Sequence, residues 1–142
     1  MESAFWDSSS LVPLCVIQPS TPMVEALSKR YKMIVWWAAP VEMQGALARL
    51  VRMSQLSAAG QTQGQIVLET LRHSWREVAP HDRLRERAES LLDQFPLTAA
   101  DALQLAAALA WCVGHPRNRP FICCDTRLLD AARQLGFQGI EG

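Results

Sequence analysis

The stretch Leu97-Thr98-Ala99-Ala100-Asp101-Ala102-Leu103-Gln104-Leu105-Ala106-Ala107-Ala108-Leu109 decides the fold of this chain. Apolar or small residues occupy nearly every side of the helix that it predicts, so we expect this helix to be buried. Its first turn nevertheless contains a carboxylate, Asp101, and an ionised Asp is costly to bury unless it is paired or binds a metal. A structural role also fits, because Thr98 and Asp101 have capping-box spacing and a negative charge suits a helix N-terminus.

Segments typical of strands alternate with segments typical of helices along the chain. Proline at the first helical position opens a helix at Ala38-Ala39-Pro40, and Gly60 and Gly64 mark a break before another helix. The alternation predicts an α/β fold in three layers, α/β/α, with a central, mostly parallel sheet of four to five strands. We expect residues 1–142 to form a single domain. The predicted strands are 3–6, 33–37, 76–79, 121–124 and 137–140, and the predicted helices include 22–31, 80–95 and 126–135.

Composition favours a globular protein, with 49% hydrophobic and 20% charged residues in a chain of 142. No apolar run reaches the roughly 18 residues that a membrane span needs, and the first residues lack the pattern of a signal peptide. The four cysteines have no Cys-x-x-Cys spacing, so we expect a reduced, cytoplasmic protein without zinc. The net charge is zero, but sequestering four carboxylates in a metal site would leave ten acids against 14 Lys and Arg, a mildly basic remainder.

Four isolated acids occupy matching positions in the predicted elements. Asp7 and Asp125 directly follow predicted strands, and Glu42 and Asp101 lie in first turns of helices. Strand C-termini and the N-termini of the following helices meet at one edge of a parallel sheet, where open α/β folds bind ligands, so we expect the four to converge. Without a counter-ion they would repel one another. Oxygen ligands without His or Cys suit Mg²⁺ or Mn²⁺, although any single acid could instead be a cap residue.

At these residues the chain resembles the PIN domain family, and within it the VapC-like toxins of bacterial toxin–antitoxin pairs. The resemblance spans nearly the whole chain, although residues 55–95 contain no diagnostic residue. It rests on Phe5-Trp6-Asp7-Ser8-Ser9, Glu42, Thr98-Ala99-Ala100-Asp101-Ala102-Leu103-Gln104-Leu105-Ala106 and Cys124-Asp125-Thr126-Arg127-Leu128-Leu129.

The resemblance implies a metal-dependent endoribonuclease that is the toxin of a type II toxin–antitoxin pair. It implies that Asp7 and Asp101 are the principal Mg²⁺ (or Mn²⁺) ligands, that Glu42 and Asp125 complete the catalytic metal site, and that Ser9 supports Asp7. It also implies an RNA substrate, a small antitoxin as partner, and a homodimer. Candidate RNA contacts are Arg127, Arg117 and Arg119, of which Arg127 is best placed because it lies two residues after Asp125.

Other phosphate-chemistry folds also place an Asp after the first strand. A haloacid-dehalogenase domain needs a second Asp two residues later, where this chain has Ser9, and a receiver domain needs a late Lys, whereas the only lysines are Lys29 and Lys32. Two alternatives stay open within the PIN-like fold. One is a nucleic-acid-binding or scaffold module without nuclease activity, and the other is a nuclease that acts on DNA.

Overall fold

The computed structural model describes all 142 residues, Met1 to Gly142. A five-stranded sheet with the order β3-β2-β1-β4-β5 forms its centre, and every neighbouring pair of strands is parallel. The predicted α/β architecture is therefore confirmed. The elements are β1 (Glu2–Trp6), α1 (Ser8–Cys15), α2 (Thr21–Arg30), β2 (Tyr31–Trp36), α3 (Ala39–Arg52), α4 (Ala58–Ser74), β3 (Arg76–Val78), α5 (Asp82–Gln94), α6 (Ala99–Trp111), β4 (Pro120–Cys123), α7 (Thr126–Leu135) and β5 (Gln138–Glu141).

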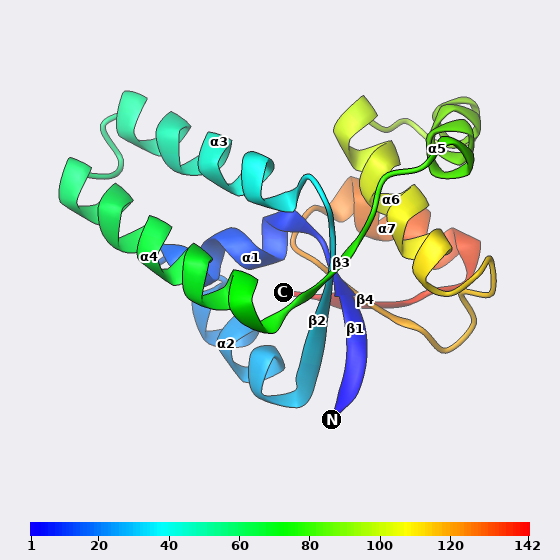
Figure 1. Cartoon of the computed structure of the whole chain (residues 1–142), viewed down its shortest axis with the longest axis horizontal. Helices are drawn as coiled ribbons and strands as arrows, with labels where there is room; N and C mark the ends of the chain where they lie inside the picture. Colours follow the sequence, from blue (N-terminus) through cyan, green and yellow to red (C-terminus); the bar gives the residue numbers. More distant parts are fainter.

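Helices cover both faces of the sheet and complete the three layers. Figure 1 shows α1 to α4 on one side and α5 to α7 on the other, with α3 and α4 extending together away from the sheet. Successive strand residues point to opposite faces, so the buried strands supply two cores. Phe5 and Phe121 belong to the core beneath α5 to α7, whereas Trp6, Val35 and Ile122 belong to the core beneath α1 to α4.

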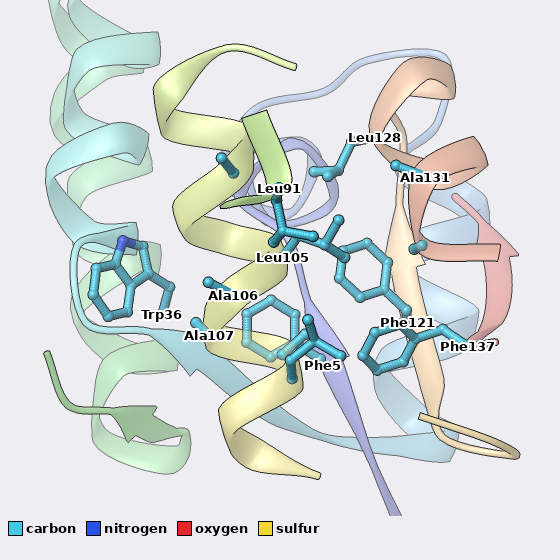
Figure 2. Packing of buried hydrophobic residues seen from close by; sticks show 14 of the residues in the cluster. Phe5, Trp36, Leu91, Leu105, Ala106, Ala107, Phe121, Leu128, Ala131 and Phe137 are labelled. Atoms are coloured by element: carbon cyan, nitrogen blue, oxygen red, sulfur yellow. The ribbon is translucent and has the colours of Figure 1, made fainter. Parts of the chain in front are cut away.

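Aromatic rings fill the core beneath α6 and α7. Phe5 stacks on Phe121 with ring centroids 5.5 Å apart, and the ring centroids of Phe121 and Phe137 are 5.4 Å apart. Figure 2 shows these three rings beside the two helices, which contribute Leu105 and Leu128. This packing ties the first strand of the chain to the C-terminal third.

Helix α6 is buried as its sequence predicts, with every side chain from Gln104 to Leu109 inside the protein. The hydroxyl of Thr98 caps the helix by accepting a hydrogen bond from the amide of Asp101 at 3.2 Å. Although α6 is strongly apolar, no helix in the chain is both long and apolar enough to cross a membrane.

Two local predictions need correction. Gly60 and Gly64 do not break the chain but lie inside α4, which already begins at Ala58 because Ser57 caps it by accepting from the amide of Gly60 at 3.0 Å. A Cβ on Gly64 would lie 3.2 Å from Leu47 Cδ2, so this glycine permits α4 to pack closely on α3. The strand predicted over 33–37 is Tyr31–Trp36, and Trp37 lies beyond it in a turn with 55% of its surface exposed.

Candidate active site

The four predicted acids lie at the C-terminal edge of the sheet. Asp7 follows β1 directly, Asp125 follows β4, Glu42 lies in the first turn of α3 after β2, and Asp101 lies in the first turn of α6. The chain continues from β1 to β2 and β3 on one side and returns to β4 and β5 on the other. The edge between β1 and β4 is therefore the point where strand order reverses, the usual ligand position in open α/β sheets.

Asp7 is an unusually placed carboxylate. Only 4% of its surface is exposed, and burial raises its pKa to about 6. Hydrogen bonds from Ser9 oppose this rise, because its hydroxyl donates to Oδ2 of Asp7 at 2.5 Å and its amide donates to the same oxygen at 3.1 Å. The negative charges of Glu42 and Asp101 raise the pKa of Asp7 further, so each of these two acids lies close enough to Asp7 to repel it.

Ser9 also connects the end of β1 to the end of β4. Its hydroxyl accepts a hydrogen bond from the amide of Cys124 at 2.9 Å. The buried thiol of Cys123 contacts Oδ2 of Asp7 at 3.5 Å and the backbone of Asp125 at 3.3 Å. The loop after β4, which contains Asp125, is thereby held beside Asp7.

Glu42 is held by two polar residues that the sequence analysis did not assign to the site. Ser8, on α1, donates its hydroxyl hydrogen to Oε1 of Glu42 at 2.6 Å. The buried amide of Gln104, on α6, donates to that same oxygen at 2.5 Å and to the Ser8 hydroxyl at 2.8 Å. One signal could have identified Gln104, since it is the only polar residue between Ala102 and Trp111 and lies three residues after Asp101, on the same helix face.

Asp101 and Asp125 form the other side of the site. Burial and the charge of Asp125 raise the pKa of Asp101, whereas contacts with Thr98 and the charge of Arg127 lower it, with a raised pKa as the net result. Oδ1 of Asp125 caps α7 by accepting from the amides of Arg127 at 3.0 Å and Leu128 at 3.3 Å. Two of the four acids therefore have the cap role, Asp7 at the start of α1 and Asp125 at the start of α7, and each uses one oxygen for it.

At three of the four acids, only one of the two carboxylate oxygens accepts hydrogen bonds from the protein. Every protein donor to Asp7 binds Oδ2, every donor to Glu42 binds Oε1, and every donor to Asp125 binds Oδ1. The second oxygen of each of these three carboxylates accepts no hydrogen bond from the protein. Both salt bridges in the protein, Arg72–Glu69 and Arg85–Asp82, lie elsewhere, so none of the four acids forms a salt bridge with a cationic side chain.

The donor set fits a hard divalent cation such as Mg²⁺ or Mn²⁺, which binds carboxylate oxygens and few other side chains. The residues that could hold such a cation are Asp7, Glu42 and Asp125, each with one oxygen free of protein donors, and the half-buried Asp101. As these side chains are placed, no three His, Cys, Asp or Glu residues lie close enough together to hold a metal ion. A cation that bound here would have to draw the carboxylates together and offset their mutual repulsion.

The three arginines predicted to contact RNA lie in different places. Arg127 is exposed at the start of α7, and its charge acts on Asp101. Arg117 and Arg119 lie in the loop before β4, at the opposite edge of the sheet, and the guanidinium of Arg119 lies 5.3 Å from the centre of the Trp111 ring. The structure brings only Arg127 to the carboxylates.

No protein-family model matches the chain, and no curated protein matches it in sequence. The solved structures that are similar in fold include the following two. PAE2754 from Pyrobaculum aerophilum superposes with a TM-score of 0.68 at 17% identity, covering 97% of this chain and 89% of its own. VapBC2 from Rickettsia felis, bound to a DNA fragment from its promoter, gives a TM-score of 0.65 at 12% identity, covering 96% of this chain and 97% of its own. At these identities the similarity shows the fold, and the chain has the PIN-like three-layer α/β/α fold.

Proposed function

We propose that this protein is a metal-dependent endoribonuclease whose catalytic and metal-binding residues are Asp7, Glu42, Asp101 and Asp125. The observation that carries the proposal is the set of carboxylates at one sheet edge, three of which keep an oxygen that no protein donor and no salt bridge engages. Retaining several uncompensated acids in one place is costly for stability. A bound cation would offset the repulsion between these carboxylates, so cation binding explains why they lie together.

The substrate chemistry follows from the charges. These acids would hold a divalent cation, whose positive charge would stabilise the attacked phosphate and the leaving 3′ oxygen and would lower the pKa of the attacking water. Asp7 and Asp101 would hold the cation most directly, with Glu42 and Asp125 completing the set. Arg127, on the rim, is positioned to bind a phosphate of the RNA, and its planar guanidinium suits that group.

We further propose that the protein is the toxin of a toxin–antitoxin pair and acts as a homodimer. The sequence resemblance to VapC-like toxins and the likeness of the fold to VapBC2 support this proposal. A small antitoxin would then inhibit the enzyme by covering the carboxylate edge. Co-expression of the chain with neighbouring small open reading frames, followed by growth measurement, tests this part separately from the chemistry.

The nuclease proposal is tested by incubating the purified chain with RNA and DNA oligonucleotides of one sequence, in Mg²⁺, in Mn²⁺ and with a chelator. Asp101→Asn removes a proposed ligand, and Asp93→Asn is the matched control because Asp93 is exposed on α5, outside the site. We expect cation-dependent cleavage of RNA by the wild type and by Asp93→Asn, and none by Asp101→Asn.

The alternatives predict other results in this assay. Cleavage of DNA and not RNA, lost in Asp101→Asn, would assign the same site to a DNA-directed nuclease. Oligonucleotide binding without cleavage under any metal condition would favour a binding module. Equal cleavage by all three proteins would show that the activity does not come from these carboxylates.

A further inference from the structure

We propose that Ser8 and Gln104 are positioning residues, which clamp Oε1 of Glu42 and thereby leave its Oε2 available to the metal. This inference rests on the proposed function and concerns residues that neither the family resemblance nor the fold similarity assigns. The Glu42 clamp, meaning Ser8 and Gln104, joins three helices from distant parts of the sequence, α1, α3 and α6.

The contacts of the clamp leave Glu42 little freedom. Oε1 accepts from Ser8 at 2.6 Å and from Gln104 at 2.5 Å, and Gln104 also donates to Ser8 at 2.8 Å, so the three polar groups close a ring. A glutamate side chain that is partly exposed otherwise samples several rotamers, and fixing it costs conformational entropy. In the folded protein the clamp holds the Glu42 side chain by protein contacts alone, as partners of metal ligands commonly do.

The orientation of the Gln104 amide depends on Glu42. Gln104 is 1% exposed and its Oε1 has no hydrogen-bond partner. Rotating the amide by half a turn would place this carbonyl oxygen against the carboxylate oxygen of Glu42, and both atoms are acceptors. The amide therefore faces Glu42 with its donors and leaves its own carbonyl unsatisfied, which is destabilising. An apolar side chain at this position would pack in the helix without leaving a buried carbonyl oxygen unsatisfied.

Ser10 provides a matched control for Ser8. Both serines are buried on α1. The Ser10 hydroxyl donates only to backbone carbonyl oxygens, those of Asp7 at 2.6 Å and Ile122 at 3.2 Å, and contacts no candidate carboxylate side chain. Its substitution therefore reports on the loss of a buried serine hydrogen bond without loss of the clamp.

The test compares wild type with Gln104→Leu, Ser8→Ala and Ser10→Ala. The measurements are Mn²⁺ affinity from the electron paramagnetic resonance of free Mn²⁺, the melting temperature without metal, and kcat and KM for RNA. We expect Gln104→Leu and Ser8→Ala to weaken Mn²⁺ binding by about 10- to 100-fold, the usual effect of losing a partner of a metal ligand. Both should lower kcat more than they raise KM.

The melting temperatures distinguish positioning from packing. Gln104→Leu should keep or raise the melting temperature. Ser10→Ala should lower the melting temperature and keep the Mn²⁺ affinity. Gln104→Met, of similar length, replaces Gln104→Leu if the branched side chain disturbs packing.

A double substitution distinguishes the clamp from a general structural role. In a Glu42→Ala background, Gln104→Leu should change Mn²⁺ affinity no further, because the residue through which it acts is gone. An equal loss in both backgrounds, or a lower melting temperature with unchanged Mn²⁺ affinity, would overturn the clamp. If Gln104→Leu had the Mn²⁺ affinity and kcat of the wild type, the positioning role of the clamp would be wrong and the proposed nuclease function would stand. A wild-type chain that neither binds Mn²⁺ nor cleaves RNA would overturn the proposed function and the clamp with it.

Discussion

Ser9 donates two hydrogen bonds to one oxygen of Asp7, from its hydroxyl and from its amide, and yet the pKa of Asp7 is raised to about 6. Both hydrogen bonds favour the ionised carboxylate, so burial and the neighbouring acids outweigh them. The protein thus holds an anion at the C-terminal end of β1 that its own side chains only partly stabilise.

Asp7 should make the metal-free protein less stable as the pH rises. Its pKa is about 6 when folded and near the ordinary value of 3.8 when unfolded, so the folded state binds the proton more tightly. The penalty is absent below the unfolded pKa, grows between the two values, and reaches about 3 kcal/mol above the folded pKa, at 1.36 kcal/mol per pKa unit. We expect the stability gain of Asp7→Asn over wild type to grow by this amount from acidic to neutral pH.

Urea unfolding across that pH range, without metal, checks the prediction. Asp130→Asn, an exposed substitution on α7, is the control and should follow the wild type at every pH. A constant difference between Asp7→Asn and wild type would mean that Asp7 has an ordinary pKa in the folded protein.

Divalent cations should stabilise the folded protein at neutral pH. Mn²⁺ at ten times its dissociation constant should add about 1.4 kcal/mol, because only the folded state assembles the ligands. Thermal unfolding with and without Mn²⁺ measures the effect, which should shrink near pH 5, where Asp7 is protonated, and in Asp101→Asn. An equal Mn²⁺ effect in wild type, Asp101→Asn and Asp7→Asn would place cation binding elsewhere on the protein.

Arg127 and Arg117 should differ in their contribution to RNA binding. Arg127 acts on Asp101 at the site, whereas Arg117 lies at the opposite edge of the sheet. Loss of one phosphate contact weakens binding and lowers the slope of log affinity against log salt by about 1. We expect this change for Arg127→Ala and not for Arg117→Ala in RNA titrations over a range of salt. The reverse order would mean that RNA binds across the other edge.

The aromatic core beneath α6 and α7 should dominate stability. Phe121 is fully buried between Phe5 and Phe137, so Phe121→Ala should cost about 3–5 kcal/mol in urea unfolding. The partly exposed Leu92 on α5 is the control, and its replacement by alanine should cost far less. Similar losses in both variants would contradict the packing described here.

The sequence was sufficient to predict the buried strands and the acids that follow them, because both depend on residues close together in the chain. Apolar runs became buried parallel strands, and the positions of Asp7 and Asp125 after two of them follow from that topology. Gly64 was misinterpreted because the sequence shows a missing side chain but not the neighbouring helix that requires its absence. The clamp of Ser8 and Gln104 on Glu42 depends on residues up to 96 positions apart, and no local pattern specifies such contacts.

The chemistry of the RNA ends tests the central claim most directly. A 5′-labelled RNA is incubated with the wild type and with Asp101→Asn, with Mg²⁺ and with a chelator, and the ends of the products are analysed. Attack by water with departure of the 3′ oxygen predicts 3′-hydroxyl and 5′-phosphate ends, formed only by the wild type and only with Mg²⁺. Cyclic 2′,3′-phosphate ends, or products that persist in Asp101→Asn or in chelator, would contradict a metal-dependent carboxylate nuclease.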